Sequence, residues 1–281
     1  MTVTEQKIQV GNLTWFYRES KPLGANTLGT VLLLHGLPSQ SYCWGEIMED
    51  MAGKGFRAIA PDWIGSGKSS KPDRRDFAYS TPAFITALAE FLAALEINQF
   101  SLVVQGFLGS VGLQYALKFP EQIQRLAILN TPISTQTKLP WQMRQWGIPL
   151  VGEMLTQDPL LIDRTLEKGS RYRINDEYLD VYRRPFLASS QAGRSLLATT
   201  QNLDIPMAMT EITTGFVNWE KPVLISWGMR DPWLDFSHTE DFIKSLKQVE
   251  VQQLPEAGHY PQEHFSGQIS EVLLPFLRRQ G

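Results

Sequence analysis

The strand, turn and helix that decide the fold come from the stretch Ser101-Leu-Val-Val-Gln-Gly-Phe-Leu-Gly-Ser-Val-Gly112. Its Leu-Val-Val run is typical of a strand that is buried on both faces. Gly106 suits a sharp turn directly after that strand, because glycine adopts positive φ without a steric penalty. A helical pattern then runs from Gly109 to Lys118. A buried strand, a tight turn and a helix in direct succession predict an α/β protein.

Strands and helices alternate on both sides of this stretch. We expect strands at Lys7–Val10, Leu13–Arg18, Thr30–Leu34, Phe56–Ala60, Phe100–Val104, Arg125–Leu129, Val223–Trp227 and Val249–Leu254. We expect helices at Ser41–Met51, Thr81–Leu95, Gly109–Lys118, His238–Lys247 and after Gln268. The pair Gly11-Asn12 favours a hairpin between the first two strands. The alternation predicts a mostly parallel, doubly wound sheet with right-handed crossovers.

The alternation stops between Pro132 and Met209. This segment is helical in pattern, contains no convincing buried strand, and is broken by Pro140, Pro149, Pro159, Pro185 and Pro206. We therefore expect residues 132–209 to form a helical cap inserted into a core of residues 1–131 and 210–281. Apolar stripes in such a cap mostly pack against the cap itself.

Composition excludes several classes of protein. The chain has 281 residues, a net charge of −3 and one cysteine, Cys43. This charge gives no electrostatic footprint for nucleic acid, and one cysteine cannot form an internal disulfide. Residues 1–7 lack the features of a secretory signal, and no apolar run reaches the ~18 to 20 residues that span a bilayer. We expect a cytoplasmic protein without a membrane span.

Four segments resemble motifs of the α/β-hydrolase family, most closely its haloalkane dehalogenase and epoxide hydrolase branch. They are Leu-Leu-His-Gly-Leu-Pro at 33–38 with Ser-Tyr-Cys-Trp at 41–44, Ala-Pro-Asp-Trp-Ile-Gly-Ser-Gly-Lys-Ser at 60–69, Trp-Gly-Met-Arg-Asp-Pro at 227–232, and Ala-Gly-His-Tyr at 257–260. The resemblance spans nearly the whole chain. It implies the α/β-hydrolase fold, a mostly parallel doubly wound sheet with an inserted helical cap.

The resemblance also implies a catalytic acid and a catalytic base. Asp231 follows a strand and matches the acid, and His259 follows the last strand and matches the base. A carboxylate at the first position would accept a hydrogen bond from the imidazole, fix its tautomer and stabilise its cation.

The third member of the expected site is missing. In this family the turn after the central strand lifts a nucleophilic side chain above the sheet, and that position is Gly106. The other possible register places Leu108 there, so neither register supplies a nucleophile. We expect Ser110 to bond to the preceding turn instead, Cys43 to be an ordinary buried residue, and Asp62 to fix its loop as a hydrogen-bond acceptor.

The surroundings of this vacated nucleophile position are apolar. Dehalogenases of the family hold halide through side-chain donors at the positions of Phe107 and Leu37, and neither residue has one. Their backbone amides could still form an oxyanion hole. We therefore expect no haloalkane dehalogenation by the family's covalent route.

Three functions remain open. We place first a pseudo-hydrolase that binds a small apolar molecule under the cap, in a pocket lined by Leu108, Trp44 and Trp141. The alternative is a hydrolase or lyase in which Asp231 and His259 activate water or substrate without a covalent intermediate. The third is a non-catalytic interaction or assembly protein with a protein partner. No motif calls for a cofactor or a metal ion.

Overall fold

The central feature of the protein is a mostly parallel sheet, seen in a computed structural model that describes residues 3–22, 24 and 27–279. The described residues form an eight-stranded sheet in the order β1-β2-β4-β3-β5-β6-β7-β8. The strands are β1 (Thr4–Val10), β2 (Leu13–Ser20), β3 (Gly29–Leu34), β4 (Phe56–Pro61), β5 (Phe100–Gln105), β6 (Ile123–Leu129), β7 (Val223–Gly228) and β8 (Val249–Leu254). Strand β2 pairs antiparallel with both β1 and β4, and every other pair is parallel. The expected doubly wound sheet is confirmed.

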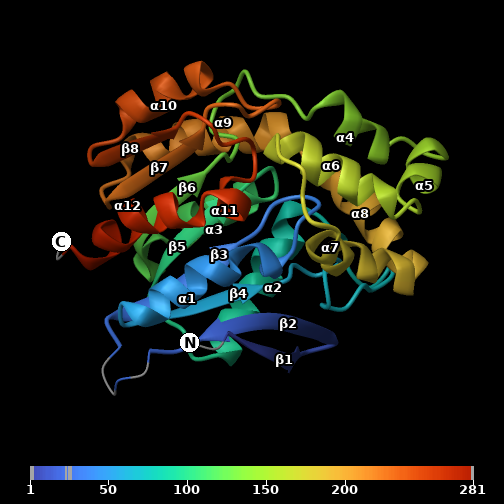
Figure 1. Ribbon diagram of the computed structural model, residues 1–281, viewed down its shortest axis with the longest axis horizontal. Coiled ribbons are helices and arrows are strands. Elements are labelled where there is room, and N and C mark those ends of the chain that lie inside the picture. The colour runs from blue at the N-terminus through green and yellow to red at the C-terminus, as the bar shows by residue number, and fades with distance from the viewer. Residues whose placement is uncertain (1–2, 23, 25–26, 280–281) are drawn as a thin grey trace.

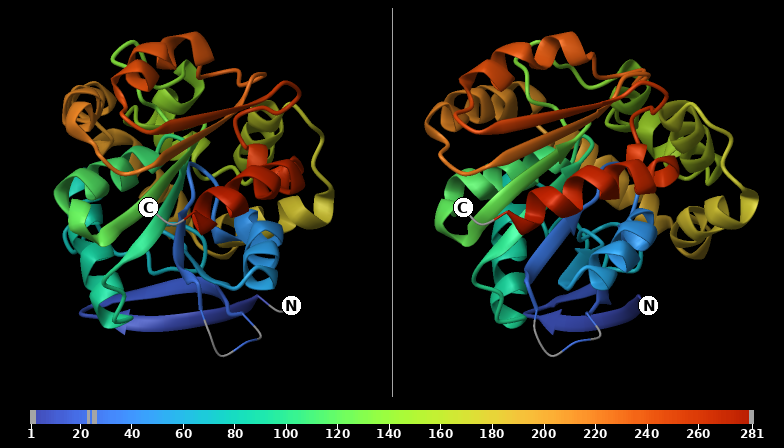
Figure 2. Two further views of the ribbon diagram at one scale, coloured as in Figure 1. Left: turned by 90° about the vertical axis from the view of Figure 1, so that its left-hand side faces the viewer. Right: turned by 60° about the vertical axis from the view of Figure 1, so that its left-hand side comes forward.

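Helices cover both faces of the sheet (Figure 2). Helices α1 (Gly45–Gly53) and α12 (Ser266–Arg278) pack together on one face. Helices α2 (Thr81–Ala94), α3 (Gly109–Lys118) and α9 (Ile205–Gly215) lie on the other. Because both faces are covered, all six residues of β5 are buried, and the apolar run that predicts this strand follows from that double burial. The shorter helices α10 (Glu240–Ser245) and α11 (Pro261–His264) precede β8 and α12 respectively.

The helices between β6 and β7 gather at one side of the molecule, at the right of Figure 1. They are α4 (Trp141–Trp146), α5 (Val151–Leu155), α6 (Leu160–Ser170), α7 (Asp176–Ala188) and α8 (Ser190–Asn202). Two of them begin at side-chain caps: Asn175 accepts from the Glu177 amide, and Ser189 accepts from the Gln191 amide. Helix α9 then packs on α3 in the core, so the expected boundary at residue 209 falls inside α9.

The effect of Pro185 differs from the sequence-based expectation. This proline was expected to break a helix, but it lies inside α7 and does not interrupt it. Proline has no N–H and so leaves the carbonyl four residues earlier without its helical donor. That carbonyl belongs to Val181, and it accepts a hydrogen bond of 2.8 Å from Nε2 of Gln40 in the core. The Gln40 side chain therefore supplies the hydrogen bond that the helix lacks at this carbonyl, and it links α7 to the loop after β3.

None of the helices in the described part of the chain has both the length and the apolar character needed to cross a membrane.

Candidate functional site

The turn after β5 carries Gly106, the position at which the sequence analysis expects a nucleophile to be missing. Gly106 has a φ of +70° and its amide donates to the Leu129 carbonyl at 3.3 Å. A Cβ atom built on Gly106 would lie 3.3 Å from Nε2 of His259 and 3.0 Å from Cα of Gly36. A side chain at this position would therefore point at the imidazole.

Asp231 and His259 are joined by a short hydrogen bond. Nδ1 of His259 lies 2.7 Å from Oδ2 of Asp231, and both side chains are at most 1% exposed. Oδ1 of Asp231 accepts from the backbone amides of Trp233 at 2.8 Å and Leu234 at 3.1 Å. These bonds hold the carboxylate in position and make Nδ1 the protonated nitrogen of the neutral ring. Nε2 then carries the lone pair, and it has no hydrogen-bond partner among the described residues.

Asn130 completes this network, and the sequence analysis did not anticipate it. Its Nδ2 donates to Oδ2 of Asp231 at 2.8 Å and to the Gly228 carbonyl at 3.1 Å, and its Oδ1 accepts from the Gly228 amide at 2.7 Å. Its φ is +39°, which costs on the order of 1 kcal/mol for a residue other than glycine. Asn130 directly follows β6. Its place as a polar residue just after a buried strand is the sequence feature from which its role could have been predicted.

Three aromatic rings surround the imidazole of His259. The Phe107 ring stacks on it with centroids 5.4 Å apart, and the rings of Trp233 and Tyr260 meet it edgewise at 4.8 Å. The Tyr260 hydroxyl donates to the Leu37 carbonyl at 2.7 Å. Such rings exclude water and their π faces attract a cation. The three rings thus shield the imidazole from bulk water.

The backbone amides of Leu37 and Phe107 border the same turn. Neither donates a hydrogen bond to another residue within the described ranges. The adjacent Gly36 amide donates instead to Oε1 of Gln105 at 3.2 Å, and Nε2 of Gln105 donates to the His259 carbonyl at 2.7 Å. Gln105 therefore ties the loop after β3 to the loop that carries His259, a role that the sequence analysis missed.

The residues expected to line a ligand pocket are spread out. Leu108 and Trp44 are fully buried, whereas Trp141 is 62% exposed on α4 beside the Arg144 guanidinium. The structure brings Leu108 to the start of α3, next to the turn. It leaves Trp141 at the surface of the cap helices.

The polar residues considered as replacements for the missing nucleophile form other contacts. Oγ of Ser110 donates to the Phe107 carbonyl at 2.8 Å, which is the local bond expected for it. Cys43 is buried, and that burial raises the pKa of its thiol. The two oxygens of Asp62 each accept a backbone amide at 2.7 Å, from Ser41 and Lys68, so Asp62 fixes two loops.

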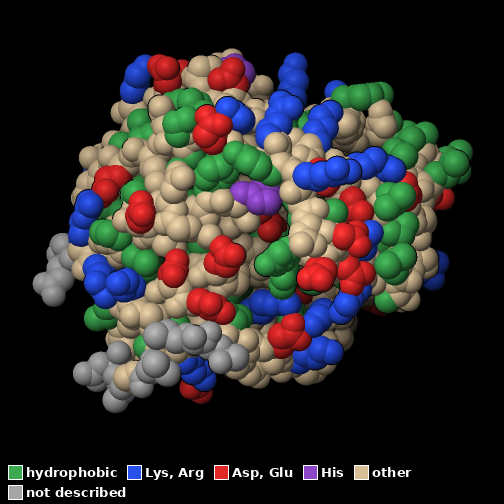
Figure 3. Space-filling model, in the orientation of Figure 1, with side chains coloured by type: hydrophobic (Ala, Val, Ile, Leu, Met, Phe, Trp, Pro, Cys, Tyr) green, Lys and Arg blue, Asp and Glu red, His purple; other side chains and the backbone are tan. Residues whose placement is uncertain are grey.

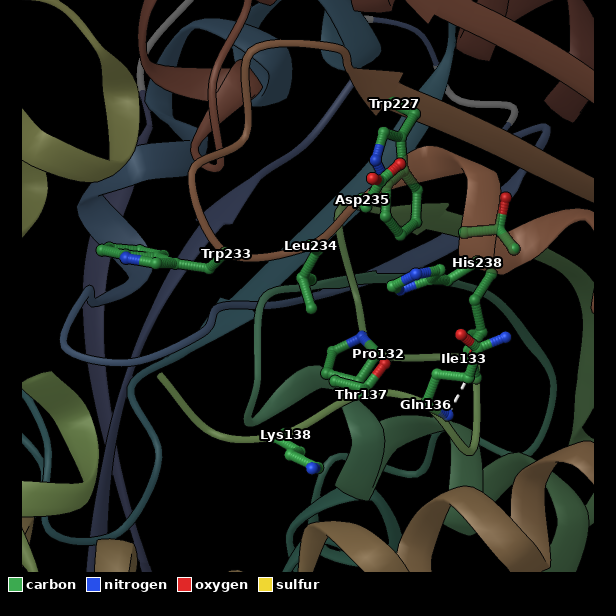
Figure 4. Close-up of a pocket in the computed structure, with 12 residues that line it drawn as sticks. Pro132, Ile133, Gln136, Thr137, Lys138, Trp227, Trp233, Leu234, Asp235 and His238 are labelled. Carbon is green, nitrogen blue, oxygen red and sulfur yellow. Dashed lines mark hydrogen bonds between the residues drawn. The ribbon is translucent and has the colours of Figure 1, made fainter. Parts of the chain in front are cut away.

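A cavity of about 300 Å³ lies beside the Asp231 loop, at the ends of β6 and β7 (Figure 4). Its walls include Pro132 and Ile133 after β6, and Trp227 and His238 on the other side. Trp233 stands apart from these residues in Figure 4 and also touches the His259 ring. The Trp233 ring is thus shared between the cavity and the imidazole.

Comparison with known proteins agrees with this architecture. A family model described as "alpha/beta hydrolase fold" matches residues 29–265. The chain is 27% identical to a cis-3-alkyl-4-alkyloxetan-2-one decarboxylase of Xanthomonas campestris, covering 88% of this chain and 86% of the relative. It is 26% identical to a haloalkane dehalogenase of Mycolicibacterium paratuberculosis, covering 92% and 88%. The crystal structure of haloalkane dehalogenase DbeA from Bradyrhizobium elkani superposes with a TM-score of 0.87 and 26% identity, covering 98% of each chain.

Proposed function

The chain belongs to the α/β-hydrolase fold family, and on that premise we propose that its Asp231–His259 pair acts as a general base on a small, mostly apolar electrophile without a covalent enzyme intermediate. One observation carries this proposal. Nε2 of His259 has no partner among the described residues and faces the position where Gly106 leaves no side chain. A buried polar atom without a partner lowers the stability of the fold by about 1–3 kcal/mol. A water or substrate molecule that hydrogen-bonds to Nε2 would offset that loss.

The proposed reaction is hydrolysis of an ester-like bond by water. Nε2 of His259 takes a proton from water while the water oxygen attacks the carbonyl carbon, and the π pair of the carbonyl moves onto its oxygen. The amides of Leu37 and Phe107 stabilise that oxyanion. The oxyanion collapses, the bond to the alkoxide breaks, and the alkoxide takes the proton from His259. Asp231 stabilises the imidazolium between the two transfers, and the products are a carboxylic acid and an alcohol.

The choice of an ester-like substrate has two supports. An oxetan-2-one, named in the decarboxylase relative, is a strained cyclic ester that carries alkyl groups. Release of halide, by contrast, needs hydrogen-bond donors, and the Leu37 and Phe107 side chains provide none. We therefore put β-lactones and short esters ahead of haloalkanes.

A second candidate is a pseudo-hydrolase that binds a small apolar molecule beneath the cap and does not turn it over. Its support is the apolar floor around the vacated position, where Leu37, Phe107 and Leu108 are at most 2% exposed. Apolar walls with a few polar groups are typical of small-molecule sites.

The test is a screen of oxetan-2-ones, esters, epoxides and haloalkanes on native protein, His259→Gln and Ser110→Ala. We expect the native protein and Ser110→Ala to open a lactone or ester at similar rates, and His259→Gln to be about 10²–10⁴-fold slower. Rapid quenching and mass measurement of the intact protein should reveal no covalent adduct. An adduct would contradict the non-covalent route. Tight binding of the same compounds without product, unaffected by His259→Gln, would establish the second candidate instead.

A further inference from the structure

A groove outside the Asp231–His259 site lies between the core and helix α7. It has a volume of about 540 Å³, within the range of small-molecule pockets. Its core side comes from β1, β2 and the loop after β4, and its cap side comes from α7 and α8. The bond from Gln40 to the Val181 carbonyl joins these two sides, so the groove is preformed.

Positive charge dominates the lining of the groove. Four cationic side chains line it, with one carboxylate, Glu5, among them. The cations are Arg18, Lys68, Lys71 and Arg184. Figure 3 shows Lys and Arg side chains on this face between α7 and the β1–β2 hairpin, with Asp and Glu side chains beside them. An anion entering the groove would meet charges from several separate elements of the fold.

Glu5 cannot neutralise these cations. Its two oxygens are shared between NH2 of Arg18 at 2.8 Å and Nζ of Lys68 at 2.6 Å. The Arg18 side chain is only 9% exposed, and its guanidinium lies over the rings of Phe16 and Tyr42. A nearly buried guanidinium that shares its carboxylate retains capacity to bind a further anion.

Lys71 has no carboxylate partner within 4.0 Å among the described residues. Its Nζ donates instead to the carbonyls of Gly67 at 2.6 Å and Ser69 at 2.9 Å. Burial lowers the pKa of this ammonium group to about 8, against the opposing charge of Asp62. A partly buried cation held only by neutral carbonyls gains more from an incoming anion than an exposed one does.

Part of the cap side of the groove is apolar. Val181, Pro185 and Ala188 on α7 form this part, and Arg184, Ser189 and Gln191 form the rest. A small inorganic anion would leave this wall unfilled. We propose that the groove binds an organic anion whose carboxylate or phosphate head meets Arg18, Lys71 and Arg184 and whose short apolar tail lies against α7. This site does not depend on the function proposed for the Asp231–His259 pair.

The test measures binding of octanoate by calorimetry, with octan-1-ol and inorganic phosphate as probes of the tail and the head alone. We expect octanoate to bind at least 10-fold more tightly than either. Lys71→Gln should weaken octanoate binding at least 10-fold, and Arg184→Gln about 3-fold. Lys168→Gln, a matched change at an exposed position of α6, should change octanoate affinity less than 2-fold. His259→Gln should also leave binding unchanged, which separates this groove from the other site.

A pH series adds an independent readout. The charge of Asp62 acts on Lys71, and the other charged groups that line the groove are Glu5, Arg18, Lys68 and Arg184. Because Lys71 loses its proton near pH 8, octanoate affinity should fall several-fold from pH 7 to pH 9.5, and Lys71→Arg should remove most of that fall.

Two results would overturn the proposal. One is octan-1-ol or phosphate binding as tightly as octanoate. The other is Lys71→Gln and Arg184→Gln both binding octanoate within 2-fold of the native protein. Arg184 is an exposed side chain that pairs with Asp180 one helical turn away, so its replacement does not threaten folding. If Lys71→Gln proves unstable, octanoate binding by Arg184→Gln within 2-fold of the native protein overturns the proposal by itself.

Discussion

The two halves of the candidate site differ in what they retain. The turn after β5 has glycine at the position where the resemblance places a nucleophile, and it is flanked by the apolar side chains of Phe107 and Leu108. The loops after β6, β7 and β8 instead hold a set of hydrogen bonds from Asn130 through Asp231 to His259. The first half offers no nucleophilic side chain, and the second, the retained half, holds an imidazole in a hydrogen-bonded frame that includes a strained backbone position at Asn130.

The two halves differ in backbone strain. Gly106 adopts its positive φ without strain, as glycine does. Asn130 has an unfavourable φ, and such strain persists only where surrounding bonds enforce it. Strained positions of this kind cluster at catalytic sites. Variants of each half show whether the retained half works and how far it depends on the turn after β5.

The largest effect is expected for Asp231→Asn. An amide has only one acceptor oxygen. Its NH2 group would therefore face either the two donors on Oδ2, from His259 and Asn130, or the backbone amides that donate to Oδ1, and the ring would lose its orientation. We expect kcat/KM for the best substrate to fall about 10²–10⁴-fold. Asp235→Asn, which alters an exposed cap of the next turn, should keep the native rate. A folded Asp231→Asn protein with native activity would show that the retained half is only structural.

The next effect concerns the frame itself. Asn130→Ala removes the bonds to Asp231 and Gly228 and leaves alanine, which tolerates the left-handed region less well than asparagine, at φ +39°. We expect the free energy of unfolding in denaturant to fall by about 3 kcal/mol. Asn130→Gly loses the same bonds without the strain, so its loss should be about 1 kcal/mol smaller. Equal losses for the two variants would mean that the backbone is not strained.

Gly106→Ala tests the half that has changed. The new Cβ would lie 3.0 Å from Gly36 Cα and take a φ of +70°. We expect a loss of about 2 kcal/mol in unfolding free energy. Gly267→Ala is the control, because its Cβ would meet nothing within 4 Å. An unchanged stability in Gly106→Ala would show that the loop carrying Gly36 yields readily.

The smallest effect links the retained half to the cap through Glu263, which accepts the Tyr182 hydroxyl of α7. Desolvation raises the pKa of the Glu263 carboxyl to about 7. In the folded protein it therefore holds a proton that the unfolded chain releases near pH 4.5, so its contribution to stability is present at low pH and is lost as the pH rises through 7.

Glu263→Gln keeps a neutral side chain at every pH. From pH 6 to pH 7.5 the native protein should lose about 1 kcal/mol more unfolding free energy than this variant does. Parallel pH profiles for the two proteins would contradict the raised pKa.

Much of the fold could be predicted because its signals are local. Strand β5 is apolar throughout its centre because both of its faces are covered, and the expected bounds of α3 match the structure. Pro185 misled the sequence analysis because its cost depends on a distant partner. Gln40 donates the hydrogen bond that Pro185 cannot donate to the Val181 carbonyl. The residues next to Pro185 in the sequence give no sign of this distant donor.

The candidate site divides in the same way. Asp231 and His259 stand in recognisable motifs, so sequence analysis could name them as a pair. The contributions of Asn130 and Gln105 depend on which strands are neighbours and on how the loops meet above the sheet. The contact of Trp233 with the imidazole likewise arises from the path of the loop after β7. These contacts arise from the tertiary structure, and no local sequence pattern predicts them.

The contact between Gly36 and Gly106 limits which side chains the turn after β5 can accept. A Cβ on either glycine would lie within 3.0 Å of the other's Cα, so the two main chains occupy part of the space that a side chain would need. A residue other than glycine at position 106 therefore fits only if the Gly36 loop shifts by a few tenths of an ångström. The loop after β3 thus sets which chemistry the turn after β5 can display.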